Sequence, residues 1–244
     1  MRFHFSLIAL SLLASWGLAQ EKSQKGDPQA IALFEEARLA RAHWVNFPGF
    51  RADLVVEVEG EKAQGKLSVD ADYKLAFSGL DKKFEEAARK ELTSVIGHRK
   101  DTSNVTTPQV VFDPAAGESP LGKAIRVVGD KNDSGYRVRD KQLTVTQRTM
   151  AKQRFVILAL ENIKNADGKY LPASHVVQYF DNETGKLVKS DSNFHSYIRV
   201  GKFDLPATAI KMTTLVEMPA KEIGPRTLRI TLSNHQLAEA FSGK

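Results

Sequence analysis

The sequence predicts an α+β domain: one long antiparallel sheet, curled into a half-barrel or open barrel, with two main helices packed on or into it. Apolar residues recur at helical spacing in only two segments, one near the start of the chain and one near residue 90. Most of the remaining sequence alternates apolar and polar residues between turn signals. A sheet of about ten strands carries more apolar surface than two helices can cover, so we expect it to curl.

The first helix is predicted over residues 28–44. Asp27 is a suitable N-cap, and Pro28 fits the first helical turn. Apolar residues follow at helical spacing as far as Trp44, and Pro48-Gly49 ends the segment.

A hairpin and a second helix are predicted next. Residues 50–58 and 67–77 alternate apolar and polar side chains, with residues 60–65 between them as a loop. The second helix is expected to begin at Asp81 and to stop at Gly97, because apolar residues between them again follow helical spacing.

The sequence after about residue 105 predicts strands and turns. We assign them to the same domain, which spans residues 27–244. The predicted strands are 109–112, 124–128, 136–139, 143–150, 154–160, 175–180, 187–197, 209–216 and 228–232. Turn sequences such as Asn165-Ala-Asp-Gly168 separate them.

The first 19 residues are typical of a cleavable signal peptide. Arg2 precedes a short apolar run, and small residues stand at Gly17 and Ala19. The run is shorter than the roughly 20 apolar residues that span a bilayer. We therefore expect an exported protein, periplasmic or secreted, with residues 20–26 as a mobile tail.

The composition excludes several kinds of chemistry. The 244 residues include no cysteine, which rules out disulfides, thiol catalysis and thiolate metal sites. No two histidines have the spacing of metal ligands on one strand or helix, so we expect neither metal nor cofactor. The formal net charge is +6, and basic residues concentrate in residues 136–154 without interleaved aromatic residues. Nucleic acid is therefore not an expected partner.

Several short motifs stand out in the sequence: Trp44-Val-Asn-Phe-Pro-Gly-Phe50, His98-Arg99, Tyr136-Arg-Val and Tyr170-Leu-Pro. They resemble those of an uncharacterised bacterial family of exported domains. The order of helix, strand pair, helix and strand meander, with Tyr170-Leu-Pro, Asp181-Asn-Glu-Thr-Gly185 and Phe203-Asp-Leu-Pro206 in its later strands, also resembles the half-barrel of lipoprotein carriers of the LolA and LolB kind. These resemblances imply the fold and the exported location.

A curled sheet lined with apolar side chains can enclose a ligand cavity. We expect its lining to be Leu54, Val56, Leu75 and Phe77 of the hairpin, with Trp44 at its lip. The alternative is that these side chains form an ordinary core, where large aromatic residues are usually found.

Two basic groups are candidate anion-binding sites. His98 and Arg99 follow the second helix, and Arg137 and Arg139 share one face of a predicted strand. The alternatives are a favourable interaction of the first pair with the helix C-terminus, and a solvated sheet face for the second pair.

These features favour a non-enzymatic carrier or binding domain for an apolar or amphipathic, lipid-like ligand. The basic residues would then bind an anionic head group. Two alternatives stay open: a cell-envelope module with a filled core that binds a protein partner, and a hydrolase with His98 or His175 beside a carboxylate.

Overall fold

The computed structural model describes residues 25–151, 153–216 and 226–238. The predicted signal peptide and most of the predicted tail lie outside these residues. None of the helices described is long and apolar enough to cross a membrane. The elements are α1 (Pro28–Leu39), β1 (Phe50–Val58), β2 (Glu61–Val69), β3 (Leu75–Ser78), α2 (Lys82–Gly97), β4 (Val110–Phe112), the short 3₁₀ helix Pro114–Ala116, β5 (Lys123–Val127), β6 (Gly135–Arg139), β7 (Gln142–Met150), β8 (Gln153–Lys164), β9 (Tyr170–Asp181), β10 (Leu187–Val200), β11 (Phe203–Leu215) and β12 (Thr227–Leu237).

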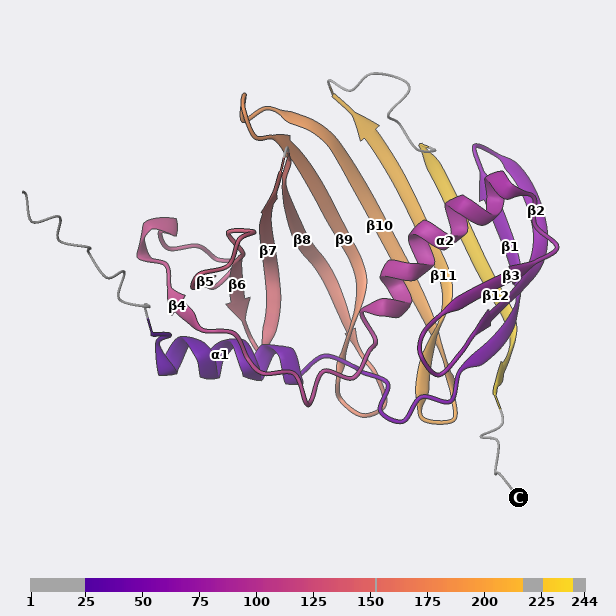
Figure 1. The fold of residues 1–244 in the computed structure, drawn as a ribbon, viewed down its shortest axis with the longest axis horizontal. Coiled ribbons are helices and arrows are strands. Elements are labelled where there is room, and N and C mark those ends of the chain that lie inside the picture. Colours follow the sequence, from indigo (N-terminus) through magenta and orange to yellow (C-terminus); the bar gives the residue numbers. More distant parts are fainter. Residues whose placement is uncertain (1–24, 152, 217–225, 239–244) are drawn as a thin grey trace, which may run out of the picture.

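The strands form one antiparallel sheet of twelve strands, in the order β3-β2-β1-β12-β11-β10-β9-β8-β7-β6-β5-β4 (Figure 1). Each of the nine strands predicted after residue 105 corresponds to one strand from β4 to β12. Two helices with a long antiparallel sheet confirm the α+β class. The sheet is neither closed nor strongly curled, so the expected half-barrel or open barrel is corrected to an open sheet.

The sheet needs less curling than the strand count suggested, because its middle strands are not uniformly apolar. On β9 and β10, His175, Asp191, Asn193 and His195 lie on one face of the sheet. This face therefore has less apolar surface that needs to be covered than a uniformly apolar sheet would have. The edge strands β3 and β4 are also short, with four and three residues, and do not pair with each other.

Helix α1 begins as predicted but ends five residues early. The Asp27 carboxylate accepts hydrogen bonds from the backbone N–H groups of Gln29 and Ala30, as an N-cap should. After Leu39 the backbone turns to pair with distant segments: the Ala42 N–H donates to the Tyr170 carbonyl at 2.9 Å. These long-range bonds compete with the next helical turn, and local spacing could not predict them.

The first hairpin has a two-residue turn in place of the predicted six-residue loop. Glu59 and Gly60 have φ angles of 52° and 85°, and positive φ at both central residues is typical of the type I′ turn of two-residue hairpins. Strand β2 therefore starts at Glu61, and its first half is largely exposed.

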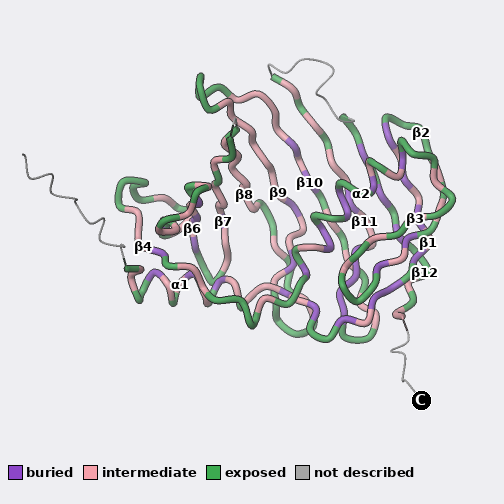
Figure 2. Tube along the Cα trace, viewed as in Figure 1, coloured by how far each residue is buried: buried purple, intermediate pink, exposed green. Residues whose placement is uncertain are grey.

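Two separate apolar cores lie on the same side of the sheet, one near each end (Figure 2). We call them the α2 core and the α1 core, and the side of the sheet that they occupy the helix-facing side. The buried members of the α2 core are Trp44, Phe47, Phe50, Ala52, Leu54, Val56, Val58, Leu67, Val69, Phe84, Ala88, Leu92, Ile96, Phe203, Leu205, Ala209, Leu228, Ile230 and Leu232. Those of the α1 core are Ala30, Phe34, Ala37, Val110, Ile125, Tyr136 and Val138.

Candidate functional site

The candidate site is the helix-facing side of β8, β9 and β10, which we call the central strands. Helix α1 packs mainly on β4, β6 and β7, and α2 mainly on β1, β3 and β11. The central strands lie between these two regions (Figure 1). Most of their residues are half-buried on both faces, as the pink segments of Figure 2 show.

Apolar and polar side chains share this surface. Residues directly opposite in a ladder lie on the same face, so Ile157, Val177 and Asp191 form one row across the central strands. Phe155 and Tyr179 form the adjacent row, with ring centroids 6.4 Å apart. Asp191 is 6% exposed and already accepts from Thr213 Oγ1 at 2.8 Å, so the part of these rows that solvent reaches is formed by Phe155, Ile157, Val177 and Tyr179.

A charged cluster joins α2 to this surface. Lys211 Nζ on β11 donates to Glu91 Oε2 on α2 at 3.0 Å, and His195 Nε2 lies 3.7 Å from Glu91 Oε1. Burial would raise the pKa of Glu91, but His195 and Lys211 together lower it to about 2. Glu91 is thus a fixed anion at neutral pH, which suits it to hold Lys211 and His195 and not to donate a proton.

His175 extends this cluster toward the central strands. Its ring centroid lies 5.4 Å from that of His195, and its Nδ1 is buried without a hydrogen-bond partner among the described residues. Burial and the charge of His195 lower the pKa of His175 to about 4, so it is neutral at pH 7. Over the described residues, no three histidine or carboxylate side chains are placed to hold a metal ion.

Two arginines lie where the helices end and the chain turns back along the sheet. Arg41 follows α1 and is bridged to Tyr170, and Arg99 follows α2. The Trp44 N–H donates to the Arg99 carbonyl at 2.7 Å, which joins the two segments. Backbone pairing at both segments therefore sets the positions of the two arginines.

Neither guanidinium has a carboxylate within 4 Å among the residues that the structure describes. Arg99 is only 1% exposed; its Nη1 donates to the Ala42 carbonyl at 3.3 Å, and its buried Nε has no partner there. Burial and the charge of Arg99 lower the pKa of Arg41 to about 10. The Arg99 guanidinium thus contacts the residue next to Arg41, and neither positive charge is paired with a carboxylate among the described residues.

The nearby histidines respond to these charges. Burial lowers the pKa of His43 to about 4, and the positive charges of Arg41 and Arg99 contribute further to this shift. His98 as a residue is exposed, yet the atoms packed around its ring and the same two arginines lower its pKa to about 4 as well. Both histidines are neutral at pH 7, so they can donate a hydrogen bond to an anion without adding charge.

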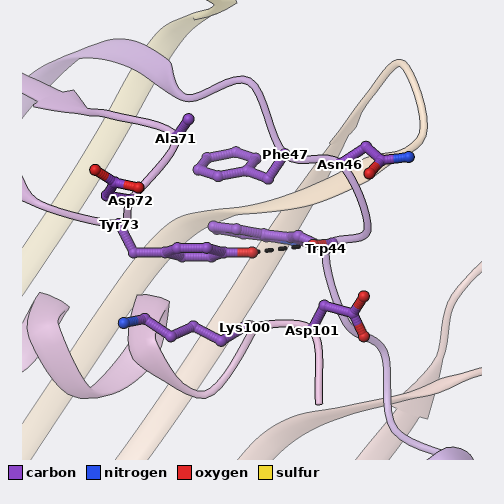
Figure 3. A pocket seen from close by; sticks show the side chains of 8 residues that line it. All are labelled: Trp44, Asn46, Phe47, Ala71, Asp72, Tyr73, Lys100 and Asp101. Carbon is purple, nitrogen blue, oxygen red and sulfur yellow. Dashed lines mark hydrogen bonds between the residues drawn. The ribbon is translucent and has the colours of Figure 1, made fainter. Parts of the chain in front are cut away.

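A shallow pocket of about 430 Å³ lies beside the α2 core (Figure 3). The Trp44 and Tyr73 rings stack at 6.0 Å, and the Tyr73 hydroxyl donates to the Trp44 carbonyl at 2.9 Å. Lys100 Nζ lies 5.3 Å from the centre of the Tyr73 ring. The pocket is lined by Trp44, Asn46, Phe47, Ala71, Asp72, Tyr73, Lys100 and Asp101.

Comparison with known proteins places the chain in a family. The family model DUF3386, described as a protein of unknown function, matches residues 25–237. The chain belongs to the DUF3386 family. No curated protein matches the sequence. A crystal structure of a DUF1329 family protein from Desulfovibrio piger is distantly similar, with 8% identity, a TM-score of 0.28, and coverage of 90% of this chain and 96% of that one.

The predicted cavity residues lie in or against the α2 core. Leu54 and Val56 are buried, and Leu75 and Phe77 are half-buried and pack against the same core. Of the five, Trp44 alone lines the pocket of Figure 3.

The predicted anion-binding residues divide into two groups. His98 and Arg99 lie together at the end of α2, beside Arg41. Arg137 donates to the carbonyls of Ala116, Gly117 and Gly122, and Arg139 donates to that of Pro120. Arg137 and Arg139 thus connect residues 116–122 to β6 through hydrogen bonds. They lie apart from His98 and Arg99.

Sequence reasoning missed Arg41, Glu91 and Lys211. Arg41 and Glu91 were treated as ordinary helix residues, and Lys211 as one polar position in a strand. Lys211 does share the alternation of buried Ala209, which places both on one face. Its partner on α2 depends on how the helix lies across the sheet, which the sequence pattern does not specify.

Proposed function

We propose that this protein is an exported, non-enzymatic binding or carrier domain for an apolar or amphipathic ligand, which lies on the helix-facing side of the central strands. One observation carries the proposal: half-exposed apolar side chains on β8 and β9 lie between two cores that are already filled. Exposed apolar surface of this kind is typical of a binding site.

The proposal places the ligand away from the residues first considered for it. Leu54 and Val56 are packed inside the α2 core, where a ligand would have to displace neighbouring side chains. Phe155, Ile157 and Val177 need no such displacement, because solvent already reaches them.

The test uses two neighbouring residues of β8 that face opposite sides. Ile157 lies on the helix-facing side and pairs with Val177, whereas Leu158 lies on the other side and pairs with Val176. Both are half-buried. We expect Ile157→Lys to weaken binding of a fluorescent long-chain fatty acid by roughly tenfold or more, because a buried charge opposes an apolar contact.

Leu158→Lys is the matched control and is expected to change the affinity by less than about twofold. Circular dichroism of both variants would establish that they fold. Equal loss from both variants, or no binding by the wild type, would contradict the proposed site.

A second candidate function is that of an envelope module that binds a protein partner. It is favoured by Phe194 on β10 and Met212 on β11, which are 41% and 45% exposed on the side of the sheet opposite the helices. Co-purification from the exported fraction with a protein, and with no bound lipid by native mass spectrometry, would favour this candidate.

A further inference from the structure

We propose that Arg41 and Arg99 form a binding site for an oxyanion, the carboxylate or phosphate head of the ligand. The inference that the bound oxyanion is the head group of a ligand rests on the proposed function. The site itself rests on geometry: Arg99, which is 1% exposed and has a buried Nε without a partner, donates to the carbonyl of Ala42, the residue after Arg41. Neither guanidinium has a carboxylate within 4 Å among the described residues.

The carboxylate that acts on Arg99 is already engaged. Asp204 acts on Arg99 electrostatically, but its Oδ2 lies 3.0 Å from Arg199 Nη1 and accepts from Asn165 Nδ2 at 2.6 Å. Asp204 is therefore not free to neutralise Arg99.

The surroundings of Arg99 support a positioned guanidinium. Its Cζ lies 5.8 Å from the centre of the Tyr197 ring, and the Tyr197 hydroxyl donates to the Pro172 carbonyl at 3.0 Å. Its Nη1 also donates to the Ala42 carbonyl. A guanidinium fixed in this way presents its remaining N–H groups in a plane, which suits the two oxygens of a carboxylate or phosphate.

The position relative to the central strands suggests how an amphipathic ligand would bind. Arg41 is bridged to Tyr170 at the start of β9, and the Arg99 guanidinium lies 5.8 Å from the ring of Tyr197 on β10. A head group on Arg41 and Arg99 would therefore leave the apolar part of the ligand near the row of Ile157 and Val177. An anion there would offset the repulsion between the two arginines.

The test compares a charged ligand with an uncharged one of the same length. The probes are a fluorescent long-chain fatty acid and its methyl ester, with inorganic phosphate as a third probe. Arg41→Gln removes the half-buried member of the pair, so the fold is expected to survive. Arg229→Gln is the charge-matched control, because Arg229 is exposed on β12.

We expect Arg41→Gln to weaken binding of the acid by roughly tenfold or more and that of the ester by less than about twofold. Arg229→Gln should change neither. Arg99→Lys, which keeps the charge but loses the planar group, should weaken binding of the acid in the same direction.

The failures of the two proposals are distinguishable. If acid and ester both bind and Arg41→Gln affects them equally, the anion site is wrong and the carrier function stands. If neither binds, the carrier function fails, and phosphate then decides the anion site. A rise in melting temperature with phosphate in the wild type, absent in Arg41→Gln, supports a site for a free anion; no rise overturns it.

Discussion

The covered ends of the sheet and its bare middle are built from the same antiparallel ladder but from different side chains. Under α2, strand β1 alternates fully buried apolar residues such as Leu54 with partly exposed ones. In β8 every residue from Arg154 to Ala159 is half-buried, so neither face is sealed. The ends therefore supply stability, and the middle supplies accessible surface on which a ligand can bind.

The largest difference is expected in the response to truncation of an apolar side chain. Leu54→Ala should lower the free energy of unfolding by about 3 kcal/mol, because Leu54 is 1% exposed and its loss leaves a cavity. Ile157→Ala should cost about 1 kcal/mol, since solvent already contacts Ile157. Urea denaturation measures both; equal losses would mean that the central strands are packed like the ends.

The next largest effect concerns the charged cluster that joins α2 to the sheet. Glu91→Gln should destabilise the protein by about 2 kcal/mol, because it leaves Lys211 largely buried without its anion. The control is Glu57→Gln in the exposed pair with Lys62, which should cost less than about 0.5 kcal/mol. A loss as small for Glu91 as for Glu57 would show that the cluster does not hold α2 in place.

A pH titration should show a smaller effect in the middle of the sheet. His175 has a pKa of about 4 in the folded protein, compared with 6.5 when unperturbed. The unfolded chain therefore binds more protons between these values, so stability falls as the pH drops from 6.5 toward 4. After allowance for solvent screening we expect about 1 kcal/mol from His175. His175→Gln should flatten this part of the stability curve; an unchanged curve would exclude the contribution.

An effect of similar size is expected at the α1 end of the sheet. Arg137→Ala should cost about 1 kcal/mol, because its guanidinium bonds to three carbonyls of residues 116–122. Limited proteolysis should cut this loop faster in the variant. The affinity for the fatty acid should stay unchanged; a matching loss of affinity would place Arg137 in the anion site.

Much of the architecture could be read from local patterns. Asp27 and Pro28 mark the start of α1, and the spacing between Asp81 and Gly97 correctly marks α2. The later strands were located because turn residues separate them. The end of α1 was wrong by five residues, because pairing of Ala42 with Tyr170 is a long-range event that no local signal reports.

The candidate site was predicted only in fragments. His98 and Arg99 were noted as a candidate anion site, but Arg41 lies 58 positions earlier in the sequence, inside the helix predicted over residues 28–44. The sequence by itself determined the fold class and located the strands after residue 105, because hydrophobic periodicity and turn chemistry are local, but it merged β2 and β3 into one strand over residues 67–77. Only the tertiary structure decided that the sheet stays open, that the two cores are separate and that Arg41 meets Arg99. Those outcomes depend on strand register and helix placement, which are set by contacts between residues far apart in the chain.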